Sequence, residues 1–578
     1  YMYERTAGEL RPFKCFIGML ESDDGVHFTH VSDQPVFTPA MAGSEHGSVQ
    51  DPRVVRIGDA CYMTYAFRPY AWHTSPTGLG VPESWLPEIP GVSFTPEENQ
   101  TRSGIAVSRD RVHWKHLAWA TPREIDDRDV ILFPEKIGGR YALLRRPLGF
   151  VGTDTGHGAD LPAIRKSYAK YADAVENMDN DIKETLDALK ADGLYEDTII
   201  IYCSDHGGVM PRSKRFLYSS GTHCPLVVRI PHKYKHLWPA EKPGMTVDRM
   251  VSFVDMPKTW LSLAGAEIPE TFQGTIFLGE GTEPEPQYHL SFRERADERC
   301  DFVRMIRDKR FAYYKNYMPY APAGQYLAYL WKILAAPAWE KYHKEGKTNE
   351  ITGRFFRPRV SEEFYDTVED FDNVHNLIDA PEHQERIARM RRAMRKMQLE
   401  LHDSGLLPES MRERRAREHN VTIYEMVRDR RLYPLESYLD AADMALARDA
   451  KDLPTFVKGM SDRDSGIRYW AVVGLHLLEG AAAPAAGTLE KALRDESDEV
   501  KIMAAWTLVK LGRKEAGLAC LRNLLNHGTT AERKLLNVLD WMEADAVPLV
   551  REYLRANPKK AKNILAKIAQ DHGIEIPK

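Results

Sequence analysis

The stretch from Thr198 to Pro231 constrains the fold of this 578-residue chain more than any other. It begins and ends with two apolar runs rich in β-branched residues, 198–202 and 225–230. Runs of this length and composition predict strands buried on both faces, as in a sheet that helices cover on either side. We therefore expect an α/β region centred on these two strands.

The polar residues of this stretch lie between the two predicted strands. Asp205 and His206 follow the first strand at its carboxyl end, which is where open α/β sheets place ligands. Lys214 comes next on the returning loop, with Arg212 and Arg215 beside it. An acid next to an imidazole, followed by a cationic loop, indicates a site for a metal ion and an oxyanion. An isolated Asp-His pair, by contrast, is more typical of a turn with a hydrogen-bonded imidazole.

The order of motifs in this stretch resembles the second half of the sulfatase family. The matching segments are Ser-Asp-His-Gly-Gly at 204–208, Lys-Arg-Phe-Leu-Tyr at 214–218 and Pro-Leu-Val-Val at 225–228. The resemblance implies an alkaline-phosphatase-like α/β fold, with Asp205 and His206 as calcium ligands. It also implies that Lys214 is the catalytic residue that contacts the sulfate group. We assign Arg212, on the same cationic loop, to substrate binding.

The sulfatase-like region is predicted to span residues 160–409, including a C-terminal subdomain. Apolar residues recur at three- and four-residue steps from Ile164 to Leu189, which predicts an amphipathic helix that ends at Gly193. The segment after Asp248 resembles the family's Val-Asp-x-x-x-Thr helix. Arg293, Arg295 and Arg299 either line a cleft for an anionic substrate or, as we expect, are surface charges. Their expected partners are Glu294, Asp297 and Glu298.

Residues 1–147 read as short strands with polar turns. Their segments recur, since 22–28 resembles 108–114, as expected of propeller blades. Gln-Asp-Pro-Arg at 50–53 resembles a motif of the five-bladed propellers of mannoside phosphorylases and β-mannosidases. This second resemblance implies a partial β-propeller, with Asp51 as proton donor and Arg128 and Arg146 as phosphate ligands. The glycine-rich segment 148–159 is interpreted as a junction.

The tail, residues 410–578, is predicted to be all α-helical. Asp464-Ser-Gly-Ile-Arg aligns on Ser497-Asp-Glu-Val-Lys, at a spacing typical of stacked helical pairs similar to HEAT repeats. Such repeats bury their faces by stacking on one another, and they also offer a surface for a protein partner. The fold class is thus multidomain: a partial propeller, a sulfatase-like α/β region and helical repeats.

Two parts of a sulfatase site are missing from the sequence. The family's formylglycine forms within Cys/Ser-x-Pro-x-Arg, and no cysteine or serine of the chain fits that motif. The Asp-Asp pairs at 23–24 and 126–127 lie in propeller-like turns rather than after an apolar strand. The chain therefore reads as a join of two incomplete enzymes, whether by gene fusion, artefactual joining or design.

Composition narrows the classes of function. The net charge of −5 gives no electrostatic case for nucleic-acid binding, and no apolar run approaches the ~20 residues that span a bilayer. The first residues do not form a signal-peptide pattern, and the sequence indicates no compartment. The six cysteines are scattered, as expected of free thiols.

Three hypotheses follow from these patterns. The first is a sulfatase-like hydrolase of sulfated carbohydrate esters, inactive as it stands because it lacks the nucleophile. The second is a mannoside phosphorylase or β-mannosidase that acts through the N-terminal segment. The third is a non-catalytic scaffold built on the helical repeats.

Overall fold

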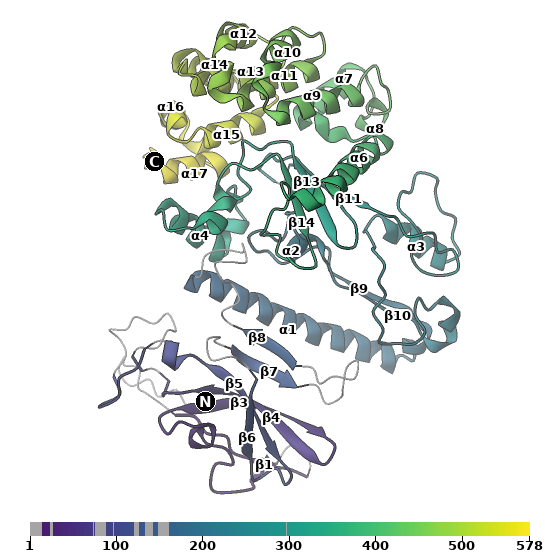
Figure 1. The fold of residues 1–578 in the computed structure, drawn as a ribbon, viewed down its shortest axis with the longest axis vertical. Helices are drawn as coiled ribbons and strands as arrows, with labels where there is room; N and C mark the ends of the chain where they lie inside the picture. The colour runs from purple at the N-terminus through teal and green to yellow at the C-terminus, as the bar shows by residue number, and fades with distance from the viewer. Residues whose placement is uncertain are drawn as a thin grey trace. The chain divides into compact units, whose positions relative to one another are not determined.

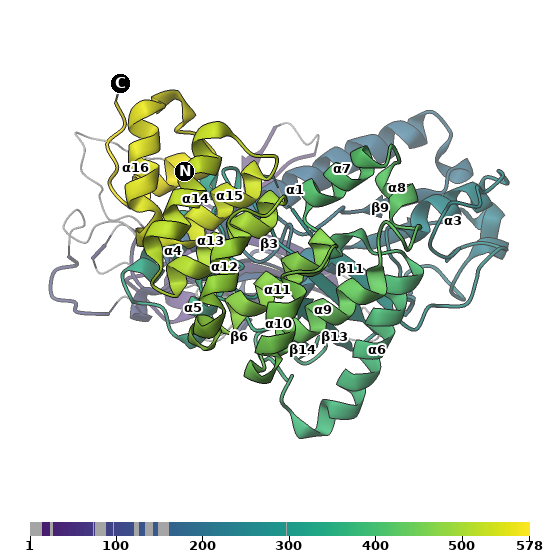
Figure 2. The ribbon, with the colours of Figure 1, turned by 90° about the horizontal axis from the view of Figure 1, so that it is seen from above.

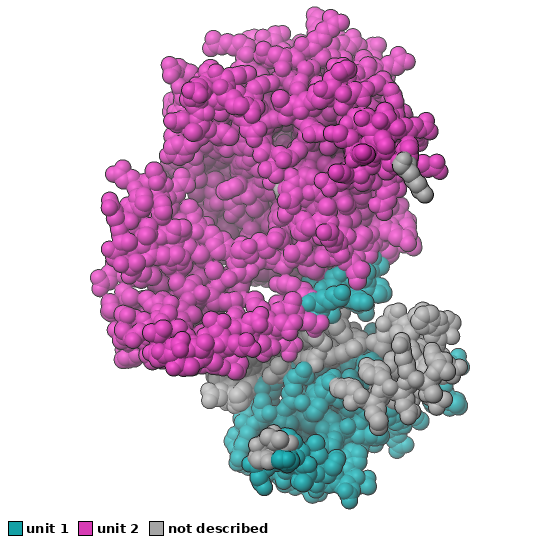
Figure 3. All heavy atoms as spheres, turned by 180° about the vertical axis from the view of Figure 1, so that it is seen from behind, with its two compact units in different colours: residues 1–152, 160–170 teal, residues 153–159, 171–578 magenta. Residues whose placement is uncertain are grey.

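The computed structural model describes residues 14–23, 27–72, 74–75, 88–95, 97–120, 127–132, 143–147, 161–295 and 297–577. The predicted junction, 148–159, lies outside these residues. The chain divides into two compact units, 1–152 with 160–170 and 153–159 with 171–578 (Figure 3). No helix among the described residues combines the length and hydrophobicity needed to cross a membrane.

The first unit is built from antiparallel strands (Figure 1). Its main sheet is a four-stranded meander of β3 (Ser48–Ile57), β4 (Ala60–Arg68), β5 (Arg102–Ser108) and β6 (Lys115–Trp119). Two further pairs are β1 (Leu20–Glu21) with β2 (Thr29–His30) and β7 (Asp127–Leu132) with β8 (Leu143–Pro147). An aromatic core that includes Phe37, Tyr65 and Trp114 covers part of the meander.

The predicted amphipathic helix is confirmed as α1 (Pro162–Ala191), and Gly193 follows it with a positive φ of 71°. The two central strands are also present, as β9 (Ile200–Cys203) and β10 (Leu226–Arg229). They form an antiparallel two-stranded sheet of their own, with Val227 opposite Tyr202.

The expectation that these strands are buried on both faces is wrong. None of their residues is fully buried, and Val227 is 59% exposed. A strand is buried on both faces only when further strands and helices surround it. Among the described residues, β9 and β10 have no strand neighbour besides each other.

The helix predicted after Asp248 is present as α3 (Asp255–Leu263). Buried Asp255 at its start accepts hydrogen bonds from the amides of Ser252, at 2.8 Å, and Thr275, at 2.7 Å. The hydroxyl of Thr259 bonds back to the Asp255 carbonyl at 2.8 Å and accepts from the Phe277 amide at 3.1 Å. The Val-Asp-x-x-x-Thr pattern therefore ties the helix start to the segment around 275.

A second four-stranded antiparallel sheet lies at the centre of unit 2 (Figure 1). Its strands are β11 (His289–Arg293), β12 (Val303–Arg307), β13 (Phe311–Asn316) and β14 (Glu362–Asp366). Side chains alternate between the two faces, as the pleat requires. One face packs against α6 (Gln384–Glu400) through Ile306, Phe311, Tyr313, Phe364, Ile387, Met390 and Met394. The other face meets the loop after β9 through Val303, Met305, Ala312, Tyr314, Tyr365, Leu217 and Tyr218.

Short helices connect these parts of unit 2. Between the strands lie α2 (Ser219–Thr222), α4 (Ala335–Lys344) and α5 (Glu350–Gly353). The tail is helical, as predicted, and consists of α7 (Glu409–Glu418), α8 (Ile423–Met426), α9 (Leu435–Ala447), α10 (Leu453–Gly459), α11 (Ser465–Leu477), α12 (Ala486–Ala492), α13 (Asp498–Lys510), α14 (Lys514–His527), α15 (Glu532–Trp541), α16 (Val547–Ala556) and α17 (Asn563–Asp571).

The two aligned repeat segments become α11 and α13, which lie side by side (Figure 2). Nearly all residues of both helices are buried. The same core cluster contains Trp470 of α11, Leu406 and Leu407 before α7, and Tyr317 after β13. Residues that flank β12 and β13 therefore share a hydrophobic core with the helical tail, whereas the faces of the sheet belong to two other clusters.

The expectation for the arginines after β11 is only partly right. Arg295 is near the surface and pairs with Glu409 at 2.6 Å. Arg293 and Arg299 are buried instead, and they pair with Asp301 at 3.0 Å and Asp540 at 2.8 Å. Burial alone would raise the pKa of Asp301, but Arg359 and Arg293 hold it below its usual value.

Burial of His476 in α11 makes the stability of unit 2 depend on pH. Thr507 donates its hydroxyl proton to the Met503 carbonyl, so its oxygen accepts from Nδ1–H of His476 at 3.1 Å. The buried Nε2 has no hydrogen-bond partner. Burial, with a smaller contribution from nearby cations, lowers the pKa of His476 well below 6.5.

We expect this histidine to destabilise unit 2 in acid. The unfolded chain binds a proton on His476 more tightly than the folded chain does. The contribution of neutral His476 to the free energy of unfolding is therefore complete above pH 6.5 and falls by about 1.4 kcal/mol per pH unit below it. His476→Gln keeps a donor for Thr507 but does not titrate. Denaturant unfolding at pH 7.5 and 5.5 should show a smaller loss of stability in the variant than in the parent protein. Equal losses would contradict the assignment.

Candidate functional site

The predicted Asp-His pair lies where the sequence placed it, directly after β9. Nε2 of His206 is 3.1 Å from Oδ2 of Asp205, and Nδ1 lies 2.6 Å from the Gly207 carbonyl. The Asp205 side chain is 82% exposed, whereas that of His206 is largely buried. Ser204 donates its hydroxyl to the His206 carbonyl at 2.5 Å. The pair therefore forms a turn whose carboxylate faces solvent.

Glycines allow the loop after His206 to fold tightly on itself. A Cβ atom on Gly207 would lie 1.9 Å from the Ser220 carbonyl oxygen, and one on Gly221 would lie 2.3 Å from the Phe216 carbonyl oxygen. The amide of Gly207 donates to the Gly221 carbonyl at 3.3 Å, and that of Lys214 donates to the Gly208 carbonyl at 3.0 Å. Asp205, His206 and Lys214 thus belong to one compact loop.

Arg212 lies inside this loop and braces it against the rest of unit 2. Its guanidinium donates to the carbonyls of Asp372, at 2.8 Å, and Asn373, at 3.0 Å, and stacks 4.1 Å above the Tyr218 ring. The residue is buried and adopts a positive φ of 66°. Asn373 also accepts from the Ser219 amide at 2.7 Å. The observed contacts of Arg212 are structural, and its role in substrate binding stays a prediction.

Lys214 differs from the arginines around it. Arg215 pairs with Asp297 and stacks 4.2 Å above the Tyr329 ring. Lys214 is half-buried, and its ammonium lies 5.9 Å from the centre of the same ring. No carboxylate among the described residues lies within ion-pair distance of this ammonium.

Tyr329 is a residue that the sequence analysis missed. Its hydroxyl is buried without a hydrogen-bond partner, and burial raises the pKa of the phenol. It lies beside both cations of the loop although more than a hundred residues of sequence separate them. The aromatic run 326–331 was the available signal, but nothing local in that run indicates contact with 214–215.

The residues present do not fit a calcium ion. Calcium takes six to eight oxygen ligands, whereas the loop offers one carboxylate and an imidazole. No three metal-binding side chains come together anywhere in the described parts of the chain. Cys224 lies near Asp205, but burial raises the pKa of its thiol, with Asp205 adding to the effect, so the thiolate is disfavoured. None of the six cysteines, all free, lies in a formylglycine motif.

The glycosidase-like candidates lie in unit 1. Asp51 has a positive φ of 54° and sits in an irregularity between Gln50 and Arg53, where the pairing of β3 with β4 shifts register. Arg128 lies in β7 opposite Arg146 in β8. The side chains of these two arginines lie outside the described part of the structure, so their predicted phosphate binding stays a prediction.

A family model described as sulfatase matches residues 94–266. This range contains the whole loop between β9 and β10. It begins within residues 1–147, which resemble a partial propeller, and ends just after α3. The match supports the sulfatase relationship that the motifs predicted.

The curated relatives found are sulfatases as well. An ulvan-active sulfatase of Formosa agariphila is 35% identical over 251 residues, which cover 43% of this chain and 40% of that protein. The human N-sulphoglucosamine sulphohydrolase is 25% identical over 263 residues, which cover 42% of this chain and 50% of that protein. The chain thus spans half or less of the length of these relatives.

Solved structures were also matched. One is a protein bound to its substrate D-glucosamine-2-N,6-O-disulfate, with 21% identity, a TM-score of 0.28, and coverage of 39% of this chain and 38% of that one.

Calcium is expected to stabilise the protein negligibly, because one carboxylate and an imidazole do not make a calcium site. Adding millimolar calcium should leave the melting temperature unchanged within about 1 °C, measured by scanning calorimetry. Asp205→Ala should behave in the same way, with Asp297→Ala as a control acid on the neighbouring segment. A shift of several degrees that Asp205→Ala abolishes would show that further residues of the chain complete a calcium site around Asp205.

Proposed function

We propose that the loop between β9 and β10 binds the sulfate group of a sulfated carbohydrate ester, with Lys214 as the oxyanion-binding cation. The observation that carries this proposal is the ammonium of the half-buried residue Lys214, which no carboxylate of the described residues neutralises. A partly desolvated cation binds an oxyanion more strongly than an exposed one. The sulfatase family match and the sulfatase relatives support the choice of sulfate ester.

The loop is built to hold Lys214 in place. Arg212, Tyr218 and Ser219 fasten it to the central sheet and to residues 372–373. A cation whose main chain is fixed loses less entropy when it binds. Arg215 is neutralised by Asp297 and adds little net charge. The loop therefore presents one cation without a carboxylate partner, Lys214, and not a diffuse positive patch, to the ligand.

Hydrolysis of the bound ester needs more than this loop. The sequence contains no Cys/Ser-x-Pro-x-Arg, so the covalent nucleophile of the family has no counterpart in it. Electrostatic stabilisation by Lys214 does not replace a nucleophile, whose removal costs several orders of magnitude in rate. We therefore propose binding without appreciable turnover for the chain as it stands.

The test combines binding and turnover. Titration calorimetry with 6-sulfated glucosamine uses a protein that carries Lys534→Met, so that this buried lysine elsewhere in unit 2 does not bind the same ligand. Binding should then weaken at least tenfold when Lys214→Met is added, as expected for the loss of a charge-assisted contact of about 1.5–3 kcal/mol. The matched control is Lys332→Met, which removes an exposed lysine near Tyr329. A chromogenic sulfate ester should not be hydrolysed. Unchanged binding in Lys214→Met would refute the role of Lys214 in binding. Turnover of the ester that Lys214→Met abolishes would refute the claim that the chain has no nucleophile.

A second candidate is cleavage of a mannoside by unit 1, with Asp51 as proton donor. It is favoured by the left-handed backbone of Asp51 at an irregularity of β3, because such bulges and strained residues concentrate at active sites. The four-stranded antiparallel meander also has the strand number of a propeller blade.

This second candidate is tested by phosphate-dependent cleavage of a mannoside. If Asp51 is the proton donor, Asp51→Asn should lower the rate by roughly 10²–10⁴-fold, the usual contribution of a general acid. Asp59→Asn, at the exposed turn between β3 and β4, is the matched control. Equal activity in both variants, or none in the parent protein, would count against the assignment.

The helical repeats are better suited to packing within the tail than to binding a protein partner. Because α11 and α13 are almost wholly buried, their apolar residues stabilise the tail and do not form an open platform. HEAT-like stacking is supported by the recurrence of these two helices and their side-by-side packing. A protein partner on the outer helices stays a prediction.

A further inference from the structure

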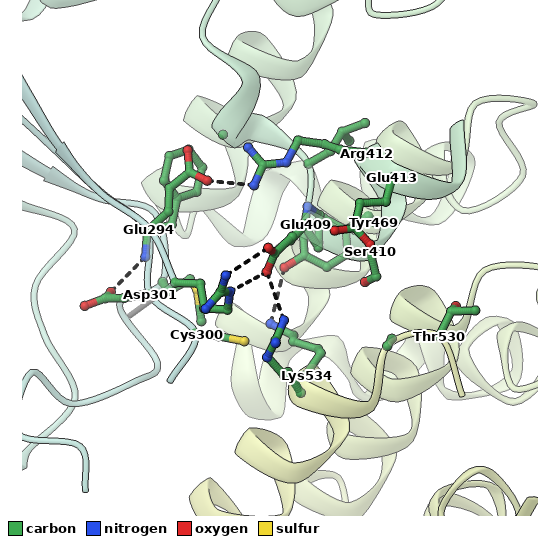
Figure 4. A pocket seen from close by; sticks show the side chains of 18 of the residues that line it. Glu294, Cys300, Asp301, Glu409, Ser410, Arg412, Glu413, Tyr469, Thr530 and Lys534 are labelled. Carbon is green, nitrogen blue, oxygen red and sulfur yellow. Dashed lines mark hydrogen bonds and ion pairs between the residues drawn. The ribbon is translucent and has the colours of Figure 1, made fainter. Parts of the chain in front are cut away.

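A cavity of about 330 Å³ lies within unit 2, between the segment that leads into α7 and the first turn of α15 (Figure 4). The β11–β12 connection closes another side. Residues that line it include Cys300, Ser410, Arg412, Tyr469, Thr530 and Lys534. None of them belongs to the loop between β9 and β10.

Lys534 is the unusual residue of this cavity. It is only 5% exposed, yet no carboxylate among the described residues lies within ion-pair distance of its ammonium. The ammonium bonds instead to the hydroxyls of Tyr320, at 3.0 Å, and Tyr469, at 3.3 Å. An ammonium has three donors, so one remains for another acceptor. Burying a charge without a counter-charge is costly, and a bound anion would offset that cost.

Each of the other cations that line the cavity has a carboxylate partner, and the lining also contains Glu413 and Glu532. Arg295 and Arg533 share Glu409, at 2.6 and 3.4 Å, and Arg412 pairs with Glu294 at 2.7 Å. In Figure 4, Lys534 lies below Glu409, and its ammonium is bonded to the hydroxyl of Tyr469. Nε of Arg412 is buried without a hydrogen-bond partner and offers a further donor.

A helix N-terminus adds to the positive potential at Lys534. The ten-residue helix α15 starts at Glu532, and no side chain caps its N-terminus at Ala531. Its first amides have no acceptor within the helix, so they and the helix dipole favour an anion. Asp498 lies nearby, but it is engaged by Lys501 at 2.6 Å and by the hydroxyl of Thr529.

We propose that this cavity binds a small oxyanion, sulfate or phosphate, either free or carried on a small solute. Lys534 would supply the charge, and the first amides of α15 and the hydroxyl of Thr530 would supply further donors. The volume exceeds that of a bare ion and lies at the lower end of small-molecule sites. The site is separate from Lys214 and does not rest on the function proposed for it.

The test uses the full chain with Lys214→Met, so that the other candidate oxyanion site is absent. Titration calorimetry at constant ionic strength compares inorganic sulfate, inorganic phosphate, 6-sulfated glucosamine and glucosamine. We expect one equivalent of oxyanion to bind and glucosamine not to bind. Adding Lys534→Met should weaken binding at least tenfold, whereas adding Lys458→Met, an exposed lysine of α10, should leave it unchanged.

Two further comparisons keep the test decisive. In Lys534→Met, Tyr320 and Tyr469 can hydrogen-bond to each other, so this variant is expected to fold. Lys534→Gln is uncharged but can still hydrogen-bond to both hydroxyls, and it should show the same loss of oxyanion affinity. Tighter binding of the sulfated sugar than of inorganic sulfate identifies a sugar ester as the ligand, and equal affinity identifies the free ion. Absence of binding by every oxyanion, or unchanged affinity in a folded Lys534 variant, overturns the proposal.

Discussion

The buried guanidinium of Arg212 is the contact on which the candidate sulfate site depends. It bonds to the carbonyls of Asp372 and Asn373, far along the chain, and stacks on Tyr218, which itself packs on the central sheet. Both hydrogen bonds are donated by Nη2, and the stacking on Tyr218 restrains the plane of the guanidinium. The left-handed backbone at Arg212 is tolerated because these bonds over-determine it. The position of Lys214, two residues later, follows from this bracing.

The buried and half-buried cations differ in whether they have a carboxylate partner, and this difference distinguishes structural cations from candidate binding residues. Arg293, Arg299 and Arg304 are buried, and each has a carboxylate partner in the described structure. Lys214 and Lys534 have none among the described residues. A buried pair contributes little net stability but is costly to break, so the arginines are held in place. An unpaired, partly or fully buried lysine instead lowers its free energy by binding an anion, which makes these two lysines the candidates for function.

The sequence predicted much of the secondary structure, but it did not predict which distant residues pack around each element. Helix α1 followed from its period of apolar residues, and the strands β9 and β10 followed from their composition. Their burial could not be predicted, because it depends on which other strands pair with them. The partners of Arg293 and Arg299 were assigned to nearby acids, but Asp540 lies 241 residues from Arg299. Tyr329 was missed for the same reason: its contacts with Lys214 and Arg215 are non-local.

The helical tail bears on the candidate site through the core it shares with the residues that flank β12 and β13. Trp470 of α11 donates its indole N–H to the Leu406 carbonyl at 2.8 Å and packs near Phe302 and Tyr317, which flank β12 and β13. The opposite face of those strands receives Leu217 and Tyr218 of the loop. Close-packed interiors transmit strain, so a change in the tail that shifts the sheet also shifts the anchor of the loop. The helices after residue 410 therefore help to fix Lys214 although none of them contributes a residue to its loop.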